Sequence, residues 1–240
     1  MDVTTNLRTA LAIFQAGFLL ESVSGFAALI VGVAALPFHG AILLVGPAFS
    51  GAGVLFLWIG RHEWNETHAQ RVGHATLAFA VTLVALLLAA LPVAILTAEG
   101  SSAPPAWAAW EFGAAVALVI GASFLTYGLV AAHLVGRTGR VGLAASLLWA
   151  WIVAAVLGLL LAPQLGTIVH LIQARSGPYD SVTRPLGPLE ALLAISYLAF
   201  FVLFSEAHYR VARGRPVEGS GAGPVTPTPG GEAMRPPVAP

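Results

Sequence analysis

The chain has 240 residues, of which 58% are hydrophobic and only 9% are charged, and its mean hydropathy is +0.84. Soluble domains carry about 25% charged residues, so this composition excludes an ordinary soluble protein and indicates an integral membrane protein. The net charge of zero gives no basis for nucleic-acid binding, and the lack of cysteine excludes disulfides and thiolate-ligated metals. All basic residues are arginine, which excludes chemistry that needs a lysine and is typical of a prokaryotic, GC-rich genome.

The first predicted membrane span covers residues 9–36 and follows a short polar N-terminus, residues 1–8. Its apolar run exceeds the roughly 20 residues that cross a bilayer, so we expect a retained helix and not a cleaved signal peptide. Glu21 lies near the middle of this run, with Ser24 one turn later and Gln15 one and a half turns earlier. A carboxylate at this depth costs about 2.5–3.5 kcal/mol, so it needs a function or a polar partner.

The face of the first span that carries Glu21 has two interpretations. Small and polar residues recur along it at helical spacing, while the other faces are Leu, Ile, Val and Phe. In one interpretation this stripe lines a solute path and Glu21 faces that path. In the other the stripe serves helix packing, and Glu21 is hydrogen-bonded to a neighbouring helix.

The second and third predicted spans cover residues 41–60 and 75–97, separated by a polar segment from Arg61 to His74. Ser50 lies within the second span, between glycines that allow close helix packing. The polar segment holds three histidines, yet their spacing matches no standard metal site. We therefore expect a solvated interfacial loop there.

The fourth, fifth and sixth predicted spans cover residues 111–135, 141–162 and 188–206. The fourth is rich in polar side chains, because Ser123 and Tyr127 lie one turn apart in it, and we expect His133 near its end to reach the interface. The long loop before the sixth span allows a short amphipathic helix from Thr167 to Gln173. Tyr197 lies within the sixth span, and the Pro- and Gly-rich residues 211–240 predict a disordered cytoplasmic tail.

The predicted fold is an all-α integral membrane protein with six transmembrane helices in one domain, residues 9–210. Six spans place both chain ends on one side, and the arginines divide nine to two in favour of that side. This positive-inside bias predicts a cell-membrane protein with both termini in the cytoplasm. The first and fourth spans share a polar, glycine-bearing middle, which is consistent with a 3+3 inverted repeat as in many transporters.

Two local stretches carry a likeness to a known family. WIGRHEWNET, Trp58 to Thr67, is similar to a basic segment that bears Asn and Thr after a second helix, and YLAFFVLFSE, Tyr197 to Glu206, is similar to a closing helix with a terminal Glu. Together with six spans and cytoplasmic ends, these stretches resemble the acetate uptake transporter family, of the succinate–acetate permease type. The Asn-Pro-Ala-Pro-Leu-Gly signature of that family is missing, and Asn6-Leu-Arg-Thr stands near its place.

A rival likeness covers the first span alone. Val23-Ser-Gly-Phe26 and the glycine-bearing stretch up to Val33 resemble the first helix of sulfite and organosulfonate exporters. Both resemblances imply transport of a small anion. An ionised Glu21 would repel such an anion, but desolvation favours the neutral acid, which makes Glu21 the candidate for proton coupling.

The sequence therefore leads to two hypotheses of different classes. The first is a transporter or channel for a small solute, such as a small carboxylate, with a path through the helix bundle lined by Gln15, Glu21, Ser24, Ser50, Ser123, Tyr127 and Tyr197. The second is a non-transport subunit that serves a redox, metal or assembly role in a membrane complex. We expect no catalytic constellation, no metal site and no cofactor; the expected partners are the lipid bilayer, a small solute, and further copies or subunits.

Overall fold

The computed structural model describes residues 3–31, 36–61, 66–134, 137–174 and 187–213. Across these residues the protein is helical and contains no strand. The helices are α1 (Val3–Val31), α2 (Leu36–Ile59), α3 (Glu66–Ala98), α4 (Ala106–Leu134), α5 (Arg137–Leu161), the 3₁₀ turn η2 (Ala162–Gln164), α6 (Leu165–Ala174) and α8 (Gly187–Ala212).

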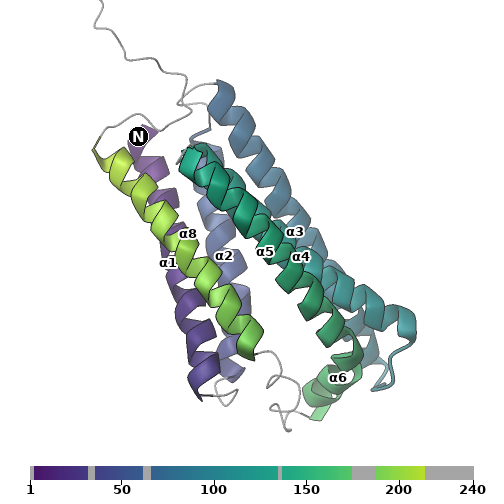
Figure 1. Cartoon of the computed structure of the whole chain (residues 1–240). Coiled ribbons are helices and arrows are strands. Elements are labelled where there is room, and N and C mark those ends of the chain that lie inside the picture. The colour runs from purple at the N-terminus through teal and green to yellow at the C-terminus, as the bar shows by residue number, and fades with distance from the viewer. Residues whose placement is uncertain (1–2, 32–35, 62–65, 135–136, 175–186, 214–240) are drawn as a thin grey trace, which may run out of the picture.

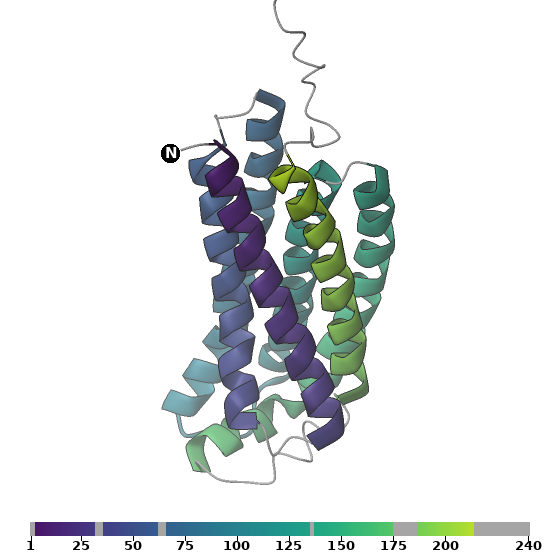
Figure 2. The same ribbon diagram turned by 90° about the vertical axis from the view of Figure 1, so that its left-hand side faces the viewer.

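The long helices run alternately up and down in one bundle (Figure 1). α1 packs along α8 and α2, whereas α4 packs along α3 and α5. Figure 2 shows α1 between α2 and α8, with the start of α1 and the end of α8 at the same end of the bundle. The Arg8 side chain confirms this placement, because its Nη2 donates to the carbonyl oxygens of Val211 (3.4 Å) and Ala212 (3.2 Å). The first and last helices are therefore neighbours.

α4 and α5 meet through glycine. A Cβ atom added to Gly113 would lie 2.5 Å from the carbonyl oxygen of Gly158, and one added to Gly158 would collide with the carbonyl oxygen of Gly113. The two backbones thus touch directly, as small residues permit in membrane helices. Further along the pair, Trp151 of α5 lies against Gly121 of α4.

α1 and α8 meet mainly through large side chains. Phe14, Phe18, Phe200 and Phe204 are almost fully buried between these helices. Gly53 of α2 gives Phe14 its space, since a Cβ there would lie 2.6 Å from the Phe14 ring. The principal core of the protein therefore contains an aromatic centre, surrounded by aliphatic side chains.

Five stretches of the described residues are long and apolar enough to cross a membrane: Asn6–Ala27, Ala69–Ala98, Ala106–Leu134, Trp151–His170 and Ala191–Ala212. Their outer faces carry large apolar side chains, and Leu77 and Leu87 of α3 are 66% and 72% exposed. Such surfaces are unfavourable in water and fit the hydrocarbon of a bilayer. The structure thus confirms an all-helical protein with the character of a membrane protein.

Several helix boundaries differ from those expected. α3 begins at Glu66, so most of the polar segment expected as an interfacial loop continues the helix of the third span. The short helix expected from Thr167 to Gln173 is present as α6. α8 continues to Ala212, past the expected end of the span at residue 206. The predicted disordered tail lies, from residue 214 onward, outside the described residues.

Candidate functional site

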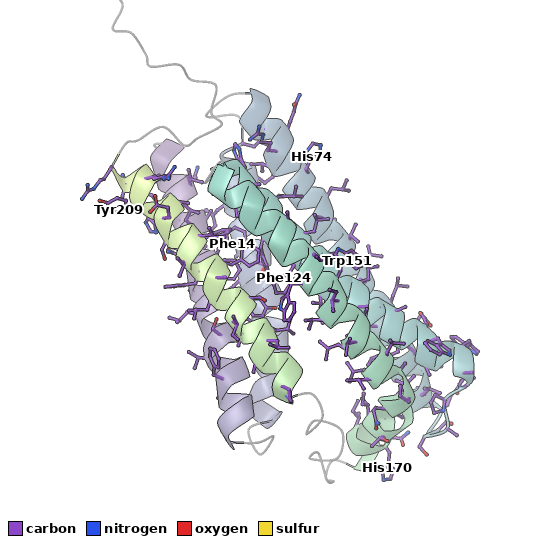
Figure 3. The ribbon with its side chains drawn as sticks, in the orientation of Figure 1. Phe14, His74, Phe124, Trp151, His170 and Tyr209 are labelled. Carbon is purple, nitrogen blue, oxygen red and sulfur yellow. The ribbon has the colours of Figure 1, made fainter. Side chains whose placement is uncertain are left out.

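A cluster of aromatic rings joins α1, α4 and α8 at the centre of the bundle. Phe18 contacts Tyr127 with ring centroids 4.8 Å apart and Phe204 at 5.0 Å, both in edge-to-face geometry. Figure 3 shows the labelled Phe14 and Phe124 in the space between α8 and the α4–α5 pair. We define this aromatic cluster by its seven residues, Phe14, Phe18, Phe124, Tyr127, Tyr197, Phe200 and Phe204.

Two of the predicted path residues form a hydrogen bond inside this core. The hydroxyl groups of Ser50 on α2 and Tyr127 on α4 lie 2.6 Å apart, and both side chains are buried. A buried phenol needs such a partner, because an unpaired hydroxyl away from water is costly. This bond ties α2 to α4 across the bundle.

Glu21 lies beside the aromatic cluster. Its side chain is half-buried on α1, and it interacts electrostatically with Tyr127 of α4 and Tyr197 of α8. The adjacent Ser22 is buried and donates to the carbonyl oxygens of Phe18 (2.7 Å) and, across the helix pair, Ala194 (3.2 Å). The two tyrosine rings lie with their centroids 6.3 Å apart, and Glu21 of a third helix lies within electrostatic range of both.

Gln15 lies nearer the end of the bundle that holds the chain termini, and it links α1 to α8. Its Nε2 donates to the Ser205 hydroxyl (2.7 Å), and its Oε1 lies 3.0 Å from His208 Nδ1, which must donate because an amide oxygen only accepts. Ser205 in turn donates to the carbonyl oxygen of Phe201 (2.8 Å). Gln15 therefore belongs to a continuous polar chain between the first and last helices.

The remaining predicted path residues lie at the margin of this arrangement. Ser24 is buried on α1, with 6% of its surface exposed. Ser123 is half-buried on α4 and makes no hydrogen bond within the described part of the chain. The structure therefore brings Ser50, Tyr127 and Tyr197 together, places Glu21 within electrostatic range of both tyrosines, and gives Ser123 no polar contact among the described residues.

A second polar pair, which the sequence did not predict, lies between α3 and α4. The expectation that His133 reaches the interface is wrong, because His133 is buried, with 5% exposed, and its Nδ1 lies 3.4 Å from Nη1 of Arg71. Leu57 of α2 lines the same small pocket. The available signal was topological, since consecutive antiparallel helices place the start of α3 beside the end of α4.

Charge is distributed unevenly between the two ends of the bundle. Every arginine whose side chain the structure describes lies at the end with the chain termini: Arg8, Arg61, Arg71, Arg210 and Arg213. Glu99 and Glu111 lie near the opposite end, where α3 ends and α4 begins. Glu206 at the arginine-rich end pairs with Arg210 at 2.7 Å.

No group of three or more His, Asp or Glu side chains gathers anywhere in the described ranges. Comparison of the chain with known family models, curated proteins and solved structures finds no match.

Proposed function

We propose that this protein is a membrane transporter that carries a small carboxylate together with a proton. The observation that carries the proposal is Glu21, a half-buried acid within a membrane-spanning helix that interacts with Tyr127 and Tyr197. Ionisable groups at this depth are costly and usually serve transport of ions or protons. The likeness to acetate uptake transporters suggests the class of solute.

We also propose that the protein crosses the membrane six times, because α2 spans it in addition to the five longer apolar stretches. Within the described residues α2 supplies a shorter apolar stretch, Ala48–Ile59, in addition to the five longer ones. The start of α1 and the end of α8 lie at one end of the bundle, and a chain whose ends share one side crosses an even number of times. An inverted repeat that relates α1–α3 to the later helices remains a prediction of this proposal.

The proposed orientation places the chain termini in the cytoplasm. The described arginines gather at that end, and cytoplasmic ends of membrane helices are enriched in Arg and Lys. The proposed path runs between α1, α2, α4 and α8. Because the aromatic cluster fills the centre of these helices, its rings must separate during each transport cycle.

The same cluster supports a second candidate function. A densely packed aromatic centre between α1, α4 and α8 also suits a subunit that holds a larger membrane complex together. In that case Glu21 would be a packing residue, held by its neighbours in the helix bundle.

The deciding experiment is flux into proteoliposomes that contain a trapped pH dye. Labelled acetate, succinate and sulfite are compared at neutral pH, where leakage of the free acid is small, for the parent protein, Glu21→Gln and Glu206→Gln. Glu206→Gln removes one carboxylate from the exposed end of α8 and is the matched control.

We expect acetate flux with proton uptake in the parent and in Glu206→Gln, and its loss in Glu21→Gln. Flux that survives in Glu21→Gln would retain transport but remove Glu21 from the path. The absence of flux for all three anions would overturn the proposal in favour of the subunit.

A further inference from the structure

The Arg71 side chain carries N–H donors for which the described residues supply only one acceptor. The guanidinium group carries five N–H donors, and its contact with His133 Nδ1 at 3.4 Å occupies one of them. Arg71 is half-buried, and it contacts no carboxylate among the residues that the structure describes. A partly buried cation of this kind favours an anion nearby.

His133 holds this guanidinium in place. Arginine only donates hydrogen bonds, so Nδ1 of His133 must accept, and the proton of the neutral ring is on Nε2. The imidazole is 5% exposed, so its position is set by the surrounding helices. Arg71 is therefore oriented from the side by a buried acceptor that adds no negative charge.

The pocket beside Arg71 is otherwise apolar. Its other lining residues come from α2, α3 and α4 and are Leu57, Val72, Ala75, Leu129, Val130 and Leu134. The cavity itself is small, about 10 Å³, so a ligand must bind at its open mouth, with a negative group on the guanidinium and a short apolar group against the side chains at the rim. The flat fork of arginine matches the two oxygens of a carboxylate.

We infer that Arg71 is a binding site for the carboxylate group of a short-chain monocarboxylate, with His133 as its positioning residue. The inference rests on the proposed function, for which it supplies the site at which the solute first binds. The site lies at the arginine-rich end of the bundle, one turn before His74 on α3, which Figure 3 labels. The other arginines at this end raise the local concentration of anions.

The test is direct binding of acetate to the purified full-length protein in neutral detergent. Saturation-transfer NMR on the acetate methyl group reports contact with the protein, and acetamide serves as the uncharged probe of the same shape. We expect saturable acetate binding, no acetamide binding, and at least about tenfold weaker acetate binding in Arg71→Gln.

Arg61→Gln is the matched control, because Arg61 lies at the same end but stacks on Trp58, 3.9 Å from the ring centroid, and donates to the Trp58 carbonyl. It should bind acetate as the parent does. Equal weakening in both variants, or unchanged binding in Arg71→Gln, would overturn the inference. Arg71→Lys keeps the charge without the fork and should bind with intermediate affinity, which preserves the test if the Gln variant does not fold.

Two substitutions of His133 test its positioning role. His133→Asn retains an oxygen that accepts from Arg71 and should restore most of the acetate binding, whereas His133→Leu should weaken it as Arg71→Gln does. Equal binding in the two variants would contradict the role. Acetate binding without flux would refute the proposed transport but not the binding site. Flux without acetate binding at Arg71 would refute the binding site but not the transport.

Discussion

α4 is held by two different kinds of contact on its two sides. Toward α5 its backbone touches that of the partner helix at Gly113 and Gly158. Toward α1 and α8 it is separated from its partners by the rings of the aromatic cluster, such as Phe124 and Tyr127. A direct backbone contact changes only if a whole helix moves, whereas rings can rotate. If the bundle rearranges, the contacts of α4 with α1 and α8 can change by ring rotation, whereas its contact with α5 cannot.

The largest loss of stability is expected for Phe18→Ala, which disrupts the contacts of α4 with α1 and α8. Phe18 is 2% exposed and contacts rings on both α4 and α8. We expect the free energy of unfolding to fall by about 3–5 kcal/mol, because the substitution leaves a cavity in a close-packed core. Unfolding in detergent, followed by circular dichroism, measures this change. A loss below about 1 kcal/mol would mean that the cluster collapses readily onto the space.

Gly113→Ala disrupts the backbone contact between α4 and α5. The added Cβ would meet the carbonyl oxygen of Gly158 at 2.5 Å, so α4 and α5 must move apart. We expect the free energy of unfolding to fall by about 1–3 kcal/mol from overpacking. Gly73→Ala on α3 is the control, because a Cβ there meets nothing within 4 Å, and it should not destabilise the protein. Equal losses in the two variants would contradict a direct backbone contact.

Tyr127→Phe separates packing from hydrogen bonding on the aromatic side. The ring and its contacts remain, while the bond to the Ser50 hydroxyl at 2.6 Å is lost. We expect a loss of about 0.6 kcal/mol in the free energy of unfolding, as for hydrogen bonds within membrane bundles. The double-mutant cycle with Ser50→Ala measures the pair itself. A coupling energy near zero would show that packing alone joins α2 to α4.

The smallest loss of stability is expected for Glu206→Gln, which touches neither the α4–α5 glycine contact nor the aromatic cluster. This substitution removes the 2.7 Å pair with Arg210, in which the Glu206 side chain is 48% exposed. We expect a loss of about 0.3–0.5 kcal/mol, because solvent screens such pairs. Repeating the unfolding measurement in high salt should remove the difference from the parent. A larger, salt-independent loss would place Glu206 in a structural role.

The sequence predicted the class of fold and part of the candidate site, for physical reasons. Apolar runs long enough to span a bilayer are visible without a structure, and Glu21 stands out because a charge within such a run is unfavourable. The sequence also singled out Tyr127 and Tyr197 of the fourth and sixth spans as residues of the same path, and in the structure Glu21 lies within electrostatic range of both. The depth of a residue follows from its position along a span.

Which residues make contacts with neighbouring helices cannot be read from position along a span. Ser123 and Tyr127 are one turn apart on the same helix face, yet only the longer Tyr127 side chain reaches a hydrogen-bond partner on another helix, Ser50. Arg71 was assigned to a solvated loop because polar residues surround it, but α3 begins at Glu66 and carries it against His133. Apolar residues on every side of a span leave no periodic signal that shows which side faces the core, so contacts between helices do not follow from the sequence.

The pairing of α1 with α8 has a consequence for the order of synthesis. Arg8 and the Val211 carbonyl are separated by 203 positions in the chain, and Gln15 and Ser205 by 190. At about 5–20 residues per second, translation takes roughly 10–40 seconds to make that length. Throughout this interval α1 is in the membrane without its main neighbour, and Glu21 without Tyr197. The nascent chain thus exposes Glu21 to lipid or to the insertion machinery until its last helix arrives.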